Sequence, residues 1–483
     1  MVQLADILEG LDYKLESGNT SVSIGQLQFD SRNVKANDVF IAVSGTHADG
    51  YQFIPKAIEN GASVIISEKA AEVPSSVVNI VIREAGKALG ILAANFYDHP
   101  SEKLKVVGVT GTNGKTTIAT VLYKLFTRLG YKAGLISTIR YYVGEKSFPA
   151  SHTTPDALRI QELMALMVEN GCTHCFMEVS SHAIDQDRIE GIKFSGGIFT
   201  NITHDHLDYH KTFAAYIEAK KKFFDKLPAT AFALTNTDDK NGMVMLQNTS
   251  ALKKTYALKT LADFKSKVLE KHLDGMLLII DDKEVWIHFS GVFNAYNMLA
   301  VYGVAIVLGE DQEAILQIIS DLKPVDGRFE IFRSPEGKYA IVDYAHTPDA
   351  IKNVLKGISD IRTGNEQVIT VIGAGGDRDK TKRPEMAKEA VLQSDKVILT
   401  SDNPRTEKPE QIIFDMEAGV EPGQKKKVLS ITDRREAIRT ACMLAKTGDI
   451  ILIAGKGHED YQEIMGQKFH FDDREIVREI FAV

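Results

Sequence analysis

One short stretch constrains the fold of this chain more than any other. An apolar run over residues 106–109 passes through the glycine-rich turn Gly111-Thr112-Asn113-Gly114-Lys115, and apolar residues then recur at helical spacing up to Leu129, before Gly130. This order predicts a buried strand, a tight turn and a helix with a glycine cap. Backbone N–H groups and the helix dipole make such a turn a cradle for phosphate. The stretch therefore predicts an ATP-binding loop in an α/β domain.

The residue types within this turn fit the same chemistry. Lys115 supplies a point charge to the phosphates, and the hydroxyl of Thr116, which is followed by Thr117, can reach a Mg²⁺ ion. Loops of this kind usually have a glycine where this chain has Val109, which indicates a tighter variant. The alternative is an ordinary glycine-rich turn with an exposed lysine.

Composition narrows the class of protein. A length of 483 residues, with 44% hydrophobic and 25% charged residues, suits about three globular domains. The net charge of −8 argues against a partner that is a nucleic acid or an acidic membrane surface. Three cysteines form no disulfide framework, and the redox-like spacing of Cys172 and Cys175 lies in an apolar run that favours a core strand. No apolar run approaches the roughly 18 residues of a membrane span, and no signal peptide is recognised, so we expect a cytoplasmic protein.

Polar breaks divide the chain into three expected units. Residues 1–99 alternate short strands and helices, residues 100–327 contain the phosphate loop, and residues 328–483 alternate strand and helix regularly. Strands in the last unit are expected near residues 339–343, 367–372, 395–400, 427–431 and 449–454. Such alternation predicts a doubly wound parallel sheet. The predicted fold class is α/β throughout.

Polar residues in the second unit follow predicted strands. Glu178 ends a strand predicted over residues 174–179, at the sheet edge where ligands bind in open α/β sheets. A strand near residues 197–201 leads into three histidines and two aspartates within residues 204–210. That cluster is compatible with zinc, but the nearby phosphate loop favours Mg²⁺; a polar loop without a metal is the alternative. Lys220, Lys221 and Lys222 lie on a predicted helix and, taken alone, indicate a solvated face.

Four polar clusters in the third unit also follow predicted strands. They occupy residues 343–346, 373–379, 401–405 and 455–459. Because the carboxyl ends of parallel strands meet at one sheet edge, the four clusters predict a binding crevice. The glycines near residue 373 do not match a dinucleotide-binding fingerprint.

Taken together, the motifs resemble those of the Mur ligases. The resemblance spans all three units and depends on residues 110–116, 178–182, 205–210, 327–328, 343–346 and 455–459. It implies an N-terminal UDP-binding domain, a central P-loop ATPase domain with a mainly parallel sheet, and a C-terminal Rossmann-like domain. The implied reaction is ATP-dependent addition of the third residue of the peptidoglycan stem peptide to UDP-N-acetylmuramoyl-L-alanyl-D-glutamate, by way of an acyl phosphate. We expect a monomer.

The resemblance also implies a role for individual residues. ATP would contact Gly111, Thr112, Asn113, Gly114, Lys115, Thr116, Thr117, Asn294 and Arg328. The UDP-linked substrate would contact Phe29, Ser31, Thr46, His47, Ala48, Thr153, Thr154, Ser180, Gln186 and Arg188. Mg²⁺ would be held by Thr116, Glu178, His206 and a carbamylated Lys220, and the implied catalytic set is Lys115, Glu178, His206 and Lys220. The amino acid would contact Arg378, Asp402, Asn403, Pro404, Arg405, Gly455 and Glu459.

Two of these implied roles determine the chemistry. Lys220 falls on the family's Tyr-x-x-Ala-Lys pattern, in which CO₂ adds to the neutral amine and turns a cation into an anionic carbamate that can bind Mg²⁺. We still expect the side chains of Lys221 and Lys222 to be exposed to solvent. Arg405 ends an Asp-Asn-Pro-Arg sequence that relatives using meso-diaminopimelate carry, and its planar fork suits that amino acid's far carboxylate. The alternative for Arg405 is an ion pair with Glu407.

Three other functions remain open at the level of sequence. The chain is also compatible with the same reaction on L-lysine, or with a sister Mur or folylpolyglutamate-type ligase that shares the phosphate loop. A nucleotide-gated binding protein without catalysis is the third. The presence of Lys115, Glu178, His206 and Lys220 argues against that last function.

Overall fold

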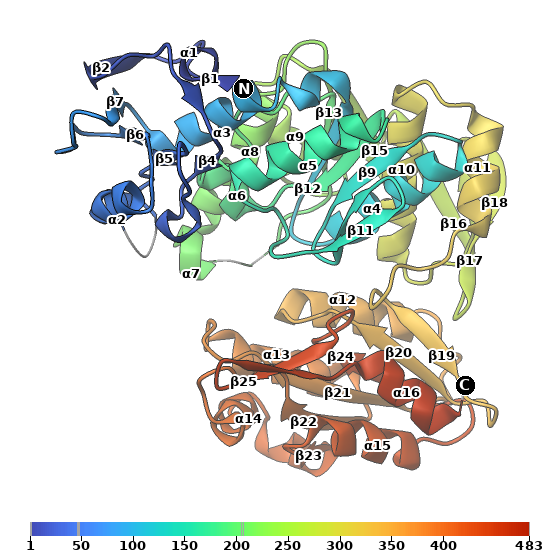
Figure 1. Cartoon of the computed structure of the whole chain (residues 1–483). Coiled ribbons are helices and arrows are strands. Elements are labelled where there is room, and N and C mark those ends of the chain that lie inside the picture. Colours follow the sequence, from blue (N-terminus) through green and yellow to red (C-terminus); the bar gives the residue numbers. More distant parts are fainter. Residues whose placement is uncertain (1, 46–48, 204, 206, 483) are drawn as a thin grey trace.

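The computed structural model places the chain in three α/β units, each with its own large sheet (Figure 1). It describes residues 2–45, 49–203, 205 and 207–482. Four of the expected site residues therefore lie outside the described residues: Thr46, His47, Ala48 and His206. Within the described part of the chain, no helix is long and apolar enough to cross a membrane.

The N-terminal unit is a five-stranded sheet in the order β2-β7-β6-β5-β4, with β2 antiparallel and the rest parallel. Alternating apolar residues of β5 and β6 are fully buried and form its core. Its elements are β1 (Val2–Gln3), α1 (Leu4–Ile7), β2 (Tyr13–Ser17), β3 (Ser23–Ile24), β4 (Leu27–Gln28), η1 (Ser31–Asn33), β5 (Val39–Ile41), η2 (Gly50–Phe53), α2 (Ile54–Glu59), β6 (Val64–Ser67), β7 (Val78–Ile82) and α3 (Ala85–Phe96).

The central unit is an eleven-stranded sheet in the order β11-β10-β9-β12-β8-β13-β14-β15-β16-β17-β18. The seven strands in the middle of this order, β9-β12-β8-β13-β14-β15-β16, run parallel. Antiparallel strands complete both edges, β10 and β11 at one and β17 and β18 at the other. Its elements are η3 (Pro100–Lys103), β8 (Lys105–Thr110), α4 (Lys115–Arg128), β9 (Ala133–Ile136), β10 (Arg140–Val143), β11 (Lys146–Pro149), α5 (Ala157–Glu169), β12 (His174–Glu178), α6 (Ser181–Asp185), β13 (Gly196–Phe199), α7 (Leu207–His210), α8 (Phe213–Asp225), β14 (Phe232–Asn236), α9 (Gly242–Met245), β15 (Leu252–Ala257), β16 (Phe264–His272), β17 (Gly275–Ile280), β18 (Lys283–Ile287), α10 (Val292–Val307) and α11 (Gln312–Asp321).

The position of β8 in this sheet explains the location of the site. Val106, Val107 and Val109 are fully buried between the neighbouring strands β12 and β13, which confirms the predicted core strand. Cys175 is fully buried in β12, and burial raises the pKa of its thiol, so the core interpretation of the Cys172–Cys175 spacing holds. Because β8, β12 and β13 run parallel, the loops that follow them meet at one sheet edge.

The C-terminal unit is a six-stranded sheet in the order β19-β20-β24-β21-β22-β23, parallel except for β19. All five predicted strands are present, as β20 to β24. The edge strand β19 and the hairpin β25–β26 were not predicted. Its elements are β19 (Glu330–Arg333), β20 (Tyr339–Asp343), α12 (Pro348–Ser359), β21 (Val368–Ala374), α13 (Lys382–Gln393), β22 (Lys396–Ser401), α14 (Pro409–Glu417), η4 (Pro422–Lys427), β23 (Val428–Ser430), α15 (Arg434–Leu444), β24 (Ile450–Ala454), β25 (Tyr461–Ile464), β26 (Gln467–His470) and α16 (Asp473–Phe481).

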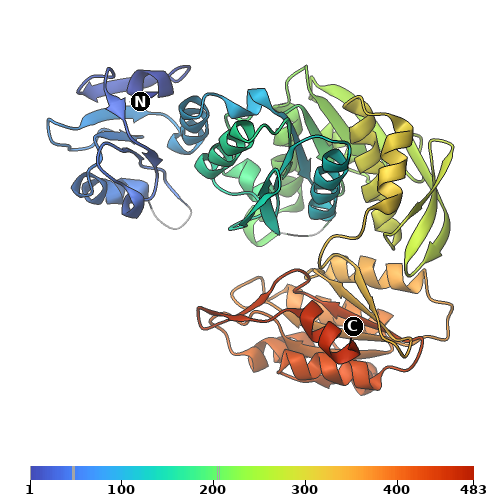
Figure 2. The same ribbon diagram turned by 45° about the vertical axis from the view of Figure 1, so that its right-hand side comes forward.

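The three units are arranged around the central one. Figures 1 and 2 show the N-terminal unit (blue) at one end of the central unit and the C-terminal unit (orange to red) against another side, with α12 turned toward the central unit. Each large sheet is built from one of the three sequence segments. This supports domain boundaries near residues 99 and 327, which we keep as a proposal.

Candidate active site

The turn after β8 has the backbone that phosphate binding requires. Gly111 and Gly114 have φ angles of +148° and +90°, which side chains disfavour. A Cβ atom at Gly111 would lie 1.9 Å from Thr200 Oγ1, and one at Gly114 would lie 2.6 Å from Asn297 Oδ1. Gly114 is also the N-cap of α4 and provides no side-chain cap. The first turn of this long helix is therefore available to an anion.

Lys115 folds over the same turn. Its Nζ donates hydrogen bonds to the carbonyl oxygens of Gly111, at 2.9 Å, and Thr112, at 2.8 Å. Burial lowers the pKa of Lys115, while the carboxylates of Glu178 and Asp205 oppose that shift. The ammonium group therefore lies over the glycine-rich turn.

A fully buried carboxylate lies next to the start of α4. Glu178 Oε2 accepts from Thr116 Oγ1 at 3.0 Å, and Oε1 accepts from the Thr138 backbone N–H at 2.7 Å and from its hydroxyl at 3.0 Å. Thr116 Oγ1 also accepts from Arg328 Nη2 at 3.0 Å. Hydroxyl and carboxylate oxygens are the donors that Mg²⁺ prefers, so Thr116 and Glu178 fit that ion.

The zinc alternative finds no support in the described residues. Among them, no group of three or more His, Cys, Asp or Glu side chains could hold a metal. Asp205 pairs with Lys382 at 2.7 Å, and His210 Nε2 lies 3.0 Å from Ser181 Oγ. These two members of the predicted cluster therefore contact different elements. His206 lies outside the described residues.

The three neighbouring lysines of α8 differ in burial and in the groups that they contact. Lys220 is 1% exposed, and its Nζ donates to Gly111 O at 3.0 Å, so it reaches the phosphate loop. Burial and the nearby Lys115 cation hold its pKa well below the usual value. The expectation of a solvated Lys221 was wrong: it is 6% exposed and pairs with Asp225 at 2.6 Å, because α6 and α9 also cover α8. Lys222 is half-exposed, 3.8 Å from Asp185.

One cavity of about 1050 Å³ joins the central and C-terminal units. It brings together most of the expected site residues: Gly111 to Thr117, Thr153, Thr154, Glu178, Ser180, Arg188, Lys220, Asn294, Arg328, Arg378, Asp402, Asn403, Arg405, Gly455 and Glu459. Four described residues of the expected site do not line it: Phe29, Ser31, Gln186 and Pro404. Phe29 is exposed and Ser31 buried in the N-terminal unit, and Gln186 bonds Tyr209 and Arg188.

Asn294 holds the start of α10. Its Nδ2 donates to Ser290 O at 2.8 Å and its Oδ1 accepts from Asn297 at 3.0 Å. The N-cap residue of α10 is Gly291, so Asn294 is not its side-chain cap.

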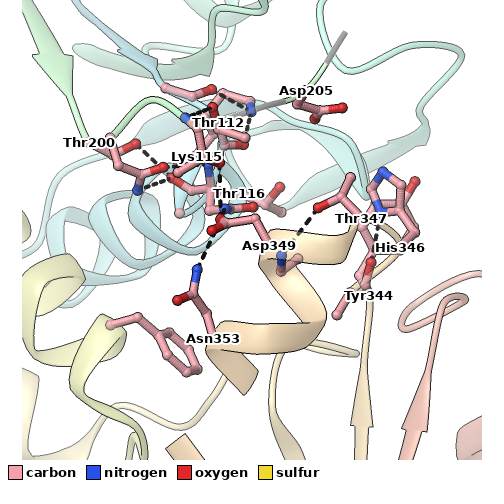
Figure 3. A pocket seen from close by; sticks show the side chains of 18 of the residues that line it. Thr112, Lys115, Thr116, Thr200, Asp205, Tyr344, His346, Thr347, Asp349 and Asn353 are labelled. Carbon is pink, nitrogen blue, oxygen red and sulfur yellow. Dashed lines mark hydrogen bonds between the residues drawn. The ribbon is translucent and has the colours of Figure 1, made fainter. Parts of the chain in front are cut away.

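Residues that the sequence did not single out connect the two units across this cavity. Asp349, at the start of α12, accepts from Asn113 Nδ2 at 3.1 Å and from Thr203 Oγ1 at 3.0 Å. Figure 3 shows Asp349 and Asn353 of α12 facing the loop that carries Thr112 and Lys115. The pair between Lys382 and Asp205 is a second such contact. These contacts depend on how the units dock, so no local pattern marks them.

The far end of the cavity is built by the loops after β22 and β24. Asn403 Nδ2 donates to Glu459 Oε2 at 2.8 Å, and a Cβ atom at Gly455 would lie 2.5 Å from Asp402 Oδ2. Arg405 has a left-handed backbone, with φ of +51°, and its Nη1 donates to Gly376 O at 2.7 Å.

Within the described part of the chain, Arg405 does not form the ion pair with Glu407 that was the alternative for it. Glu407 pairs with Arg383 at 2.7 Å, and hydrogen bonding to that guanidinium is the main cause that lowers the pKa of Glu407 to about 2. Arg405 instead places Nε 3.5 Å from Glu463 Oε2. Its guanidinium thus remains at the cavity wall.

The chain matches three Mur ligase family models in order. The catalytic domain of the Mur ligase family matches residues 23–97, the Mur ligase middle domain residues 109–305, and the glutamate ligase domain of Mur ligases residues 327–457. The chain therefore belongs to the Mur ligase family.

Two relatives of the chain carry the same name. The chain is 57% identical, over 100% of its length and 99% of the relative, to the UDP-N-acetylmuramoyl-L-alanyl-D-glutamate–2,6-diaminopimelate ligase of Parabacteroides distasonis. It is 41% identical to the ligase of that name from Clostridium tetani, over 99% of each chain. A solved structure of such a ligase matches with a TM-score of 0.69 at 32% identity, covering 100% of this chain and 99% of the other. The MurF ligase of Thermotoga maritima, solved in complex with ADP, shares the fold at 20% identity, with a TM-score of 0.64 over 89% and 93% of the chains.

Proposed function

We propose that this chain is an ATP-dependent ligase that adds meso-2,6-diaminopimelate to UDP-N-acetylmuramoyl-L-alanyl-D-glutamate. The observation that carries the proposal is the single cavity that runs from the phosphate loop to the loops holding Arg405 and Glu459. Full-length relatives at 57% and 41% identity are named for this reaction. We further propose that the enzyme acts in the cytoplasm as a monomer.

The chemistry joins two steps in that cavity. An oxygen of the glutamyl side-chain carboxylate attacks the γ-phosphorus of ATP, ADP leaves, and an acyl phosphate forms. The neutral amine of diaminopimelate then attacks the acyl carbon, phosphate leaves, and the nitrogen releases one proton to solvent as the amide bond forms. Lys115 and the first turn of α4 neutralise the charge on the phosphoryl oxygens. The contacts of Asp349 and Lys382 help to close the C-terminal unit over the site, which excludes water from the acyl phosphate.

Mg²⁺ belongs to the proposal as a cofactor. Thr116 and Glu178 would hold it, together with His206 and a carbamate on Lys220. When bound, Mg²⁺ stabilises negative charge on phosphate oxygens. In the ammonium form Lys220 would repel this ion, whereas the carbamate, formed with release of a proton, supplies a carboxylate-like ligand from a fully buried position beside the phosphate loop.

Most of the described residues proposed to bind the substrates line this cavity. Thr153, Thr154, Ser180 and Arg188 would hold the muramyl-dipeptide part, with Gln186 acting through Arg188. Phe29, Ser31 and the residues Thr46, His47 and Ala48 would meet the uridine diphosphate part in the N-terminal unit. Arg378, Asp402, Asn403, Pro404, Arg405, Gly455 and Glu459 would form the amino-acid end.

The test is the mass of the product. Purified protein is incubated with UDP-N-acetylmuramoyl-L-alanyl-D-glutamate, ATP and an equimolar mixture of L-lysine and meso-diaminopimelate. We expect one new UDP-linked product, heavier by one diaminopimelate residue, with ADP formed in equal amount. A lysine adduct would establish the alternative substrate, and ATP turnover without any adduct would reject the ligase.

Lys220→Ala is expected to bind ATP but to form product at least about 100-fold more slowly, because a ligand of the proposed metal site is lost. Small carboxylates such as acetate, which fill the space of the carbamate, are expected to restore part of the rate. The matched control is Lys222→Ala, since Lys222 is half-exposed on the same helix. Equal rates for the two variants would contradict the carbamate.

A further inference from the structure

A lysine that the proposed reaction does not use lies beneath the amino-acid loops. Lys456 follows β24, and its side chain is 0% exposed. Its Nζ lies 3.2 Å from Asn403 Oδ1, 3.2 Å from Glu459 Oε2 and 3.9 Å from Asp402 Oδ1. All three partners line the cavity, whereas Lys456 does not. Any effect of Lys456 on a ligand must therefore pass through these partners.

The lysine fixes the orientation of the two groups that it contacts most closely. An ammonium group only donates hydrogen bonds, so it selects the oxygen of the Asn403 amide. The amide nitrogen then points to Glu459, where Nδ2 donates to the same Oε2 atom at 2.8 Å. Lysine, amide and carboxylate form a closed network that joins the loop after β22 to the loop after β24. The backbone N–H of Glu463 adds a second donor to Asn403 Oδ1, at 3.0 Å.

Two arginines near these loops have other partners. Arg434 is fully buried, but it pairs with Asp473 at 2.7 Å and donates to Ala454 O at 3.0 Å. Arg405 contacts Glu463 and Gly376. In the part of the chain that the structure describes, Lys456 is the one cation within 4 Å of the carboxylates of Asp402 and Glu459. A buried carboxylate without such a partner is strongly disfavoured.

We propose that Lys456 is a positioning residue for the diamino-acid substrate. It holds the Glu459 carboxylate and the Asn403 amide in the orientation that accepts the ammonium group at the substrate's far end. This inference depends on the proposed function, because it assigns that far end to Glu459. Lys456 thereby sets the affinity for the amino acid, and ATP and the UDP-linked substrate, which bind elsewhere in the cavity, are unaffected.

The test replaces Lys456 by methionine, which keeps the length of the side chain and removes its charge. We expect the KM for meso-diaminopimelate to rise at least about tenfold, as for the loss of one partner in a buried charged network. The KM values for ATP and for the UDP-linked substrate are expected to change less than about twofold. The matched control is Lys468→Met. The Nζ atoms of Lys456 and Lys468 lie over the ring of Tyr461, 5.4 and 4.1 Å from its centroid, but Lys468 is exposed.

A double variant separates positioning from folding. Lys456→Met/Glu459→Gln removes both charges of the pair, so no carboxylate at position 459 is left without its cation. Because Lys456 also orients Asn403, the double variant is expected to raise the KM for diaminopimelate above that of Glu459→Gln, but by a smaller factor than Lys456→Met raises it above that of the unaltered enzyme. An unchanged KM in Lys456→Met, an equal rise for all three substrates, or a rise by the same full factor when Lys456→Met is added to Glu459→Gln would overturn the inference. Failure of the unaltered enzyme to form the diaminopimelate adduct would overturn the proposed function as well, and product mass from the same preparation distinguishes the two failures.

Discussion

Replacing Lys115 by alanine is expected to lower ATP-dependent product formation by about 10²- to 10³-fold or more. The ammonium group lies over the phosphate loop, 2.9 Å from Gly111 O and 2.8 Å from Thr112 O. Loss of one preorganised group that stabilises transition-state charge costs roughly this factor, and phosphoryl transfer depends almost entirely on such groups. The measurement is kcat for release of ADP and for the UDP-linked adduct, at saturating substrates.

The effect should be confined to the ATP step. Binding of the UDP-linked substrate, measured by calorimetry without ATP, is expected to stay within about twofold, because the uridine part is assigned to the N-terminal unit. Arg128→Ala provides the control: it lies at the other end of α4, half-exposed, in an ion pair with Asp321. A Lys115→Ala enzyme with the rate of the unaltered protein would show that this loop does not bind ATP.

The parts of the fold that the sequence predicted are those with a strong hydrophobic pattern. Four of the five strands expected in the C-terminal unit, β20, β21, β22 and β24, are short apolar runs bounded by polar residues, and such runs are buried in a parallel sheet. The fifth, β23, is an edge strand with an exposed Leu429. The strand β19 and the hairpin β25–β26 were missed. All three strands are short; β19 and β25 are only partly buried and β26 is exposed, so no apolar run marks them.

In the candidate site, too, some residues could be predicted from local sequence patterns, whereas others depend on how the elements pack. The phosphate loop and Glu178 could be found because chain order alone places them at the ends of neighbouring parallel strands. Lys221 was misjudged because a run of three lysines contains no information on the helices α6 and α9 that cover α8. The contacts of Asp349 and Lys382 join residues far apart in sequence. They exist only once the C-terminal unit docks on the central one.

The contact partners of Arg405 bear on how selective the amino-acid site can be. Arg405 is partly exposed, with 22% of its side chain accessible, and already donates to Gly376 O. A bound lysine, which lacks the far carboxylate of diaminopimelate, would therefore leave the guanidinium short of one partner but not wholly unpaired. Sites whose charged groups are left fully unpaired reject such an analogue by about 10⁴-fold. A smaller factor, about 10²- to 10³-fold, is expected here, since loss of one partner of a charged pair costs about 2–5 kcal/mol.

Unaltered enzyme is therefore expected to prefer meso-diaminopimelate over L-lysine by this factor in kcat/KM, and Arg405→Ala is expected to lose most of the preference. The loss should arise from a raised KM for diaminopimelate, with kcat/KM for lysine nearly unchanged, because lysine never contacts the guanidinium fork. Arg439→Ala is the control, since Arg439 lies on α15 of the same unit and its side chain is 60% exposed. Competition between the two amino acids, followed by product mass, measures the ratio directly. Efficient use of L-lysine by the unaltered enzyme would contradict the role of Arg405, and so would a variant that keeps the full preference.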